Sequence, residues 1–179
     1  MSKSVFDTLL ESERLILRRL STDDAEDMYE YTSNHLVTTH LSWEPHTDIN
    51  QTREFINRVC EKYDLQNTEF TYGIELKTNR KLIGALKILN ISYYNKRAEF
   101  TSILNPIYQG KGYMGEAWQM LLKYCFEEAG LNRIQSYVTP ENFASIKKNL
   151  KAGLVLEGRL KDWWLMKGEF KDALVYAIT

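Results

Sequence analysis

The sequence has few of the residues that mark special structural classes. Its 179 residues include two cysteines and three prolines. Cys60 and Cys125 lie in segments with the period of an amphipathic helix, without the Cys-x-x-Cys or Cys/His spacing of a metal or redox site. The two thiols are therefore predicted to pack in the core rather than to serve as ligands or nucleophiles.

Net charge and long apolar runs are also scarce. The 23 basic and 24 acidic side chains give a formal net charge of −1, and no basic run occurs, so direct nucleic-acid binding has no obvious electrostatic source. Residues 1–10 contain Lys3 and Asp7 and lack the apolar stretch of a signal peptide or membrane anchor. We expect a cytoplasmic protein that does not bind membranes.

The remaining composition is typical of an ordinary globular protein. Apolar residues make up 44% of the chain and charged residues 26%, and this length suffices for one substantial core. No linker, repeat or low-complexity segment divides the sequence. We therefore expect a single domain over residues 1–179.

Strand-like and helix-like patterns follow one another along the chain. Strands are expected at residues 13–20, 70–76, 82–91, 98–104, 133–138, 154–166 and 170–178, and helices at 25–33, 47–63 including the capping residues, 116–129 and 140–153. Hairpins are expected early and late, the late one about Gly168, with a strand-helix-strand crossover between them. This order predicts an α/β (α+β) fold, in which helices cover both faces of a mixed sheet.

Three of the nine glycines fall within Gly110–Gly115, between a strand that stops at Pro106 and an amphipathic helix. Glycine lets backbone amides turn inward, and the start of a helix adds free N–H groups and partial positive charge. Such a junction suits an anion such as pyrophosphate, with Lys111 adding charge at its rim.

Two other phosphate loops have related patterns. A P-loop requires Lys followed by Ser or Thr where this chain has Glu116 and Ala117. The string Gly110–Gly115 does match the GxGxxG of NAD-binding folds, but its position along the chain differs from theirs. An NAD-dependent oxidoreductase is therefore the weaker alternative.

The loop resembles a motif of a known family. Residues 109–114 are similar to the Gln/Arg-x-x-Gly-x-Gly/Ala motif of the GNAT superfamily of acetyltransferases, with Met114 in place of the last Gly/Ala. Other segments follow in the order and spacing of its ribosomal-protein N-acetyltransferase subgroup, namely residues 14–18, 82–84, 98–100, 142–145, 151–154 and 157–158. The resemblance covers residues 13–178 and implies a GNAT-like, mostly antiparallel central sheet.

The resemblance also implies a reaction and a cofactor, namely acetyl transfer from acetyl-CoA (coenzyme A) to a primary amine by direct attack on the thioester. The implied cofactor-binding residues are Ile103, Leu104, Gln109, Gly110, Lys111, Gly112, Tyr113, Met114, Gly115 and Asn142. The acceptor could be the N-terminal α-amine of a ribosomal or other protein, a polyamine or a small amino compound. A CoA-binding sensor or interaction module without turnover is the alternative from another class.

Two side chains are candidates for catalysis. The acceptor amine must lose a proton, which a carboxylate can take, and Glu99 matches a position where GNAT relatives can carry a base. The alternative for Glu99 is a solvent-facing carboxylate paired with Lys96 or Arg97. Ser145 matches the family's Asn-x-x-Ser, which implies donation to the departing thiolate, although Asn142 and Ser145 would also suit helix capping and back-bonding. A backbone N–H of the strand that carries Glu99 is expected to donate to the oxyanion that forms on the thioester carbonyl.

Aromatic residues and histidines are candidates for the acceptor side. Trp43 and His46 lie in a connection that lines the acceptor site in GNAT relatives, so both are predicted to bind substrate. The three histidines of the chain are spaced by five and six residues, which fits no known zinc pattern, and no metal is predicted. Trp163 and Trp164 are expected on opposite faces of the last hairpin, with at least one of them in the core.

Overall fold

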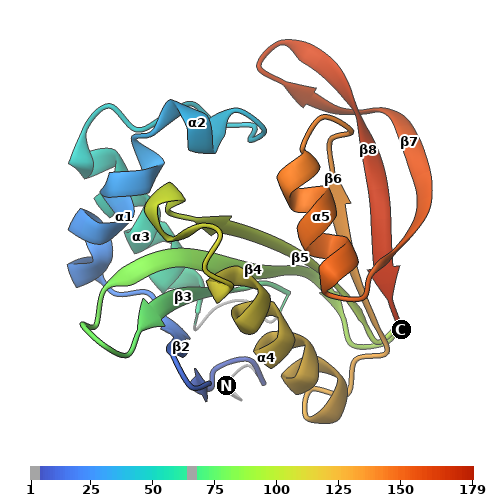
Figure 1. Cartoon of the computed structure of the whole chain (residues 1–179), viewed down its shortest axis with the longest axis horizontal. Coiled ribbons are helices and arrows are strands. Elements are labelled where there is room, and N and C mark those ends of the chain that lie inside the picture. Colours follow the sequence, from blue (N-terminus) through green and yellow to red (C-terminus); the bar gives the residue numbers. More distant parts are fainter. Residues whose placement is uncertain (1–4, 64–67) are drawn as a thin grey trace.

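The computed structural model describes residues 5–63 and 68–179, which form one sheet covered by helices (Figure 1). The described strands follow the spatial order β1-β2-β3-β4-β5-β6-β8-β7. The strands are β1 (Leu10–Glu11), β2 (Leu15–Arg19), β3 (Phe70–Leu76), β4 (Leu82–Ser92), β5 (Arg97–Leu104), β6 (Arg133–Val138), β7 (Val155–Met166) and β8 (Glu169–Ile178). The helices are α1 (Ala25–Thr32), α2 (His35–Thr38), α3 (Ile49–Lys62), α4 (Tyr113–Glu127) and α5 (Phe143–Lys151).

The sheet is mixed and mostly antiparallel, as predicted. Among the described strands, β5 and β6 run parallel and every other neighbouring pair is antiparallel. Parallel neighbours need a crossover connection, and α4 supplies it. The predicted strand-helix-strand unit therefore lies in the middle of the sheet, directly after the glycine cluster.

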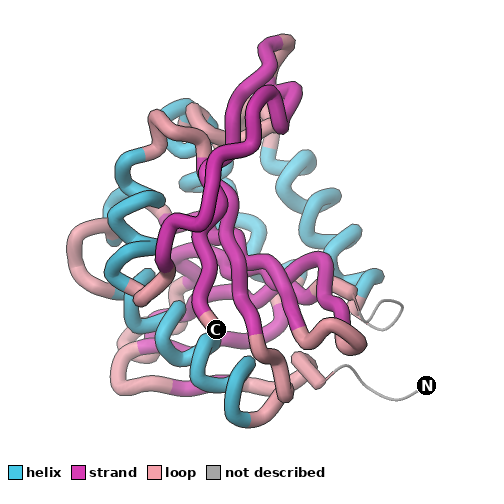
Figure 2. The backbone as a smooth tube through the Cα atoms, turned by 90° about the vertical axis from the view of Figure 1, so that its right-hand side faces the viewer, coloured by secondary structure: helices cyan, strands magenta, loops and turns pink. Residues whose placement is uncertain are grey.

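Helices pack on both faces of the sheet (Figure 2). On β5, the Phe100 ring meets the Trp118 ring of α4 edge to face, with centroids 5.3 Å apart. Ile103 packs instead against a cluster that contains Met28 of α1 and Ile56 of α3. Successive side chains of a strand alternate between its faces, so Phe100 and Ile103 point in opposite directions and β5 has packed layers on both sides.

The two thiols differ in burial. Cys125 on α4 is fully buried, as predicted, and burial raises the pKa of its thiol. Cys60 on α3 is partly buried, packs at the edge of the core and donates its S–H to the Leu20 carbonyl at 3.4 Å. Burial also raises the pKa of Cys60, and neither environment favours a reactive thiolate.

Some short elements were not predicted. The segment between the predicted helices 25–33 and 47–63 contains α2, a single turn that begins after Asn34. The Asn34 side chain accepts from the Leu36 amide at 2.9 Å. A four-residue helix is too short to show a hydrophobic period. The two-residue β1 was missed for the same reason. Among the described helices, none is both long and apolar enough to cross a bilayer.

Candidate functional site

Strands β5 and β6 separate in the middle of the sheet. They pair where Arg97–Glu99 lie beside Arg133–Gln135, although β5 continues to Leu104 and β6 to Val138. Beyond the paired part, a cavity of about 880 Å³ opens between the strands and is lined by residues of both. Residues of α2, α5, β4 and β7 also line it. A cavity that interrupts a sheet in this way can hold an elongated ligand.

Several of the predicted site residues meet in this cavity. Its walls include Glu99, Ile103, Leu104, Gln109, Asn142 and Ser145. The predicted residues 110–115 lie outside these walls on the adjoining loop, and Gln109 joins the loop to the cavity through a long contact of 3.5 Å from its side-chain amide to the Leu104 carbonyl. The structure therefore places the loop at one end of the cavity.

The loop has the backbone of an anion site. Gly110 and Gly112 have φ values of 77° and 84°, in the left-handed region that favours glycine. Helix α4 begins at Tyr113, three residues earlier than predicted, and no side chain caps its first turn. Its first N–H groups thus lack intrahelical partners and are available to an anion. Gly115 lies in this turn, where a Cβ would meet open space.

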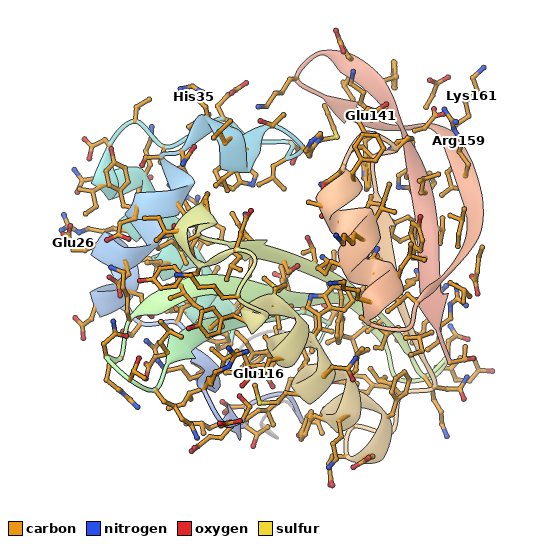
Figure 3. All side chains as sticks on the ribbon, viewed as in Figure 1. Glu26, His35, Glu116, Glu141, Arg159 and Lys161 are labelled. Carbon is orange, nitrogen blue, oxygen red and sulfur yellow. The ribbon has the colours of Figure 1, made fainter. Side chains whose placement is uncertain are left out.

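Arg14 holds this loop from the far end of the chain. Its guanidinium donates to the Lys111 carbonyl at 3.1 Å and to Glu116 at 2.7 Å, and it lies over the Tyr113 ring at 4.6 Å. Burial opposes the charge of Glu116, but hydrogen bonds from Ser12 and Arg14 outweigh it, and the pKa of Glu116 is lowered. Figure 3 shows Glu116 near the start of α4. No sequence signal pointed to this contact, because Arg14 and Lys111 are 97 residues apart.

Glu99 lies at the point where the strands separate. Gln135 is buried on β6 and donates to Glu99 at 3.2 Å and to the Tyr137 hydroxyl at 2.9 Å. The alternative pairing with Lys96 or Arg97 does not occur, and Glu99 forms no ion pair within the described part of the chain. The carboxylate is half-buried and borders the cavity, a suitable place for a base.

Asn142 is the N-cap of α5, and its side-chain oxygen accepts from the Ser145 amide at 3.1 Å. The capping alternative is therefore present, but Asn142 also borders the cavity. The Ser145 hydroxyl makes no hydrogen bond with another residue that the structure describes, so the alternative of back-bonding to the helix is not seen. It remains free to donate to a ligand.

Sequence reasoning missed Lys148, which also borders the cavity. Its ammonium group donates to Ser102 Oγ at 2.8 Å and lies 4.4 Å from the centroid of the Trp118 ring. Burial lowers the pKa of Lys148 to about 7. A signal was available, because Lys148 follows Ser145 by three residues on the same predicted helix and so lies one turn further along the same side.

The two tryptophans of β7 do not alternate as expected. The register shifts between Leu160 and Trp164, and Asp162 has a φ of 52°. This irregularity brings both indole rings to Tyr137, with Trp163 stacked at 5.9 Å and Trp164 edge to face at 6.4 Å. Neither tryptophan is in the core, and both line the cavity. The prediction that one would be buried was wrong because a bulge reorients alternate side chains.

Trp43 and His46 lie outside the cavity walls, which take His40, Leu41 and Ser42 from the same region. His46 Nδ1 is 2.7 Å from Thr52 Oγ1, and its ring lies 5.4 Å from that of Trp43. Burial and then the charge of Arg58 lower the pKa of His46. The described residues include no group of three or more His, Cys, Asp or Glu side chains placed to hold a metal ion.

A tether links the β7–β8 hairpin to the region of α2 beside the cavity. Lys167, in the turn between β7 and β8, donates to the Thr38 carbonyl at 3.2 Å and lies 3.3 Å from the Glu44 carboxylate. In Figure 1 the tip of this hairpin leans toward α2. The cavity thus has the anion loop at one end and, at the other, a wall made by the hairpin and α2.

Known proteins share this sequence and arrangement. The model of the acetyltransferase (GNAT) domain family matches residues 14–155. The "Uncharacterized N-acetyltransferase p20" of Bacillus licheniformis is 33% identical over 169 residues, which cover 94% of each chain. A GNAT-family acetyltransferase from Bacillus anthracis superposes with a TM-score of 0.84 at 30% identity, over 96% of this chain and 98% of that one. Spermidine N-acetyltransferase from Vibrio cholerae, solved with CoA and spermine, superposes with a TM-score of 0.77 at 26% identity, over 93% and 96%.

Proposed function

The chain belongs to the GNAT family of acetyltransferases and is an acetyl-CoA-dependent N-acetyltransferase, and from this premise we infer that it acetylates an N-terminal α-amine within the cavity between β5 and β6. The observation that carries the proposal is the separation of these strands beyond Glu99 and Gln135. It opens a passage from the anion loop to a carboxylate, which is what transfer between a pyrophosphate-bearing donor and an amine requires.

The loop and β5 would hold the donor. The backbone N–H groups at residues 110–115 suit the pyrophosphate of acetyl-CoA, and Lys111 is exposed beside them. Ile103, Leu104 and Asn142 border the cavity where the pantetheine arm would run. When bound, the cofactor supplies the acetyl group as a thioester.

Three groups of the chain would serve the transfer itself. Glu99 takes the proton of the acceptor nitrogen, and the hydrogen bond from Gln135 holds its carboxylate in place. A backbone N–H on the unpaired part of β5 polarises the thioester carbonyl. Ser145 supplies a proton for the departing sulfur, because its hydroxyl faces no competing partner among the described residues.

The walls and rim of the cavity favour an acceptor with a single amine on a larger molecule. The described carboxylates in its walls are Glu99 and Glu141, whereas a polycation would be matched by a larger acidic excess. Its rim carries exposed apolar side chains, among them Leu36, Trp163 and Leu165. Such a rim suits the side chains that follow an N-terminal α-amine in a peptide.

A panel of acceptors tests the proposal. Thiol release from acetyl-CoA is measured with peptides that have a free α-amine, with the same peptides blocked at the α-amine, and with spermidine. We expect turnover with the free peptides alone. Turnover with spermidine but not with peptides would replace this acceptor by a polyamine. Thermal stabilisation by acetyl-CoA but no turnover with any amine would favour a CoA sensor, and stabilisation by NAD alone would favour the oxidoreductase.

A further inference from the structure

Lys148 is a cation in the cavity without an anionic partner. It follows Ser145 by three residues and Asn142 by six, and all three border the cavity. Its Nζ donates to Ser102 on β5 and lies over the Trp118 ring of α4. Neither neighbour carries a charge, and no described carboxylate pairs with Lys148.

Such a position is costly for an ammonium group. Trp118 is fully buried, and burial alone lowers the pKa of Lys148 to about 7. An apolar side chain would fit there at lower free-energy cost. An ionisable group with a perturbed pKa that lies in a ligand cavity without a charged partner is a candidate for a functional role.

The place of Lys148 along the cavity indicates which part of the cofactor it meets. Along the chain, Ser102 of β5 lies between Glu99, where the proposed function places the acceptor amine, and Gln109, which joins the anion loop to the cavity. It is three residues from Glu99 and seven from Gln109. If the pyrophosphate lies on the loop and the amine at Glu99, the carbon–sulfur bond that breaks lies nearer to Ser102 than the phosphates do.

We propose that the Lys148 ammonium group stabilises the negative charge that forms on the coenzyme sulfur as the acetyl group leaves; this rests on the proposed function. In the transfer, a carbon–nitrogen bond forms and the carbon–sulfur bond breaks, with its electron pair remaining on sulfur. The amine proton goes to Glu99. The sulfur takes a proton through the Ser145 hydroxyl, which takes one from solvent in the same step. Lys148 stays protonated because the negative charge that forms beside it raises its pKa above the value of about 7 that it has in the protein alone.

The other titratable groups around the cavity are few, which makes the proposal testable. They are His40, Glu99, Tyr137 and Glu141, and none is bonded to Lys148. Lys148→Met removes the charge and keeps an unbranched chain, and Lys148→Arg keeps the charge. Wild type and both variants are compared in their complexes with CoA, whose bound thiol is titrated through the ultraviolet absorbance of its thiolate.

We expect the bound thiol to titrate at least one pH unit lower in wild type than in Lys148→Met, a tenfold change in its ionisation constant. Turnover of Lys148→Met should fall about tenfold or more, and Lys148→Arg should recover most of both effects. Adenosine 3′,5′-bisphosphate, which lacks the pantetheine and the sulfur, should bind wild type and Lys148→Met equally.

Two results would overturn the proposal. Equal thiol titration in wild type and Lys148→Met would exclude a role at sulfur, and weaker binding of the bisphosphate to Lys148→Met would place the charge at the phosphates. Failure of wild type to bind CoA at all would instead refute the proposed function. Thermal unfolding of Lys148→Met, with a midpoint no lower than that of wild type, shows that the variant is folded.

Discussion

Replacing Lys148 by methionine removes a partly buried ammonium group from the space beside Trp118 and Ser102. If the lysine serves function at the expense of stability, the variant should be the more stable protein. The pKa of Lys148 falls from its ordinary 10.5 to about 7 through burial. One pKa unit corresponds to about 1.4 kcal/mol, so holding the charge costs about 5 kcal/mol below pH 7.

The pKa of about 7 belongs to Lys148 with its contacts to Ser102 and Trp118 in place, so this cost includes them. The expectation is that Lys148→Met gains up to about 5 kcal/mol of unfolding free energy at pH 6. The pKa of Lys148 is lower in the folded protein than in the unfolded chain. Between about pH 7 and pH 10.5, Lys148 therefore carries its proton in the unfolded chain but not in the folded protein. Stability of wild type therefore rises with pH in this window, and the advantage of the variant shrinks by about 1.4 kcal/mol per pH unit.

Urea unfolding of both proteins at pH 6, 7, 8 and 9 measures this difference. The remaining ionisable groups are the same in the two proteins, so their contributions cancel when the free energies are subtracted. The difference should be constant from pH 6 to just below pH 7 and then decline. A difference that does not change with pH, or a variant less stable than wild type at pH 6, would refute the reasoning.

Three further substitutions probe other parts of the site. Glu99→Gln should lower turnover by about 10²–10⁴-fold and flatten the acidic limb of the pH-rate profile; a retained limb would exclude Glu99 as the base. Arg14→Ala should weaken CoA binding about tenfold in calorimetry, because the loop loses its contacts at Lys111 and Glu116; unchanged affinity would mean that the loop holds its shape alone. Gly84→Ala would place a Cβ 2.4 Å from the Ile103 carbonyl, so urea unfolding should show a loss of about 1–3 kcal/mol, and a wild-type midpoint would contradict the close approach.

Local sequence patterns predicted most of the fold and the glycine loop at one end of the site. The long strands and helices follow from their apolar periods, and the glycine loop could be recognised because its residues are adjacent in sequence. The contacts that shape the site join distant segments. Lys148 and Ser102 are 46 residues apart, and Arg14 and Glu116 are 102 apart. No local pattern encodes such a pair.

The aromatic wall shows a second reason for the difference between prediction and structure. Strict alternation sends Trp163 and Trp164 to opposite faces, but the bulge about Asp162 brings both rings to Tyr137. Between Leu160 and Trp164, β7 advances four residues while β8 advances two, and such extra residues change the local direction of the side chains. Asp162 gives little warning of its left-handed backbone, since aspartate tolerates that conformation but seldom adopts it.

The separation of β5 from β6 also explains how a carboxylate and an ammonium group can share one cavity without neutralising each other. Glu99 and Ser102 are three residues apart on β5, so alternation directs them to opposite faces of the sheet. Lys148 donates to Ser102 and therefore lies on the face covered by α4 and α5. Glu99 accepts a hydrogen bond from Gln135 instead. If β5 and β6 were paired along their whole length, the sheet would separate Glu99 from Lys148. Because pairing ends at Glu99, a ligand that passes between the strands can meet the base from one face and the cation from the other, which allows proton removal and stabilisation of the leaving group to proceed at separate positions.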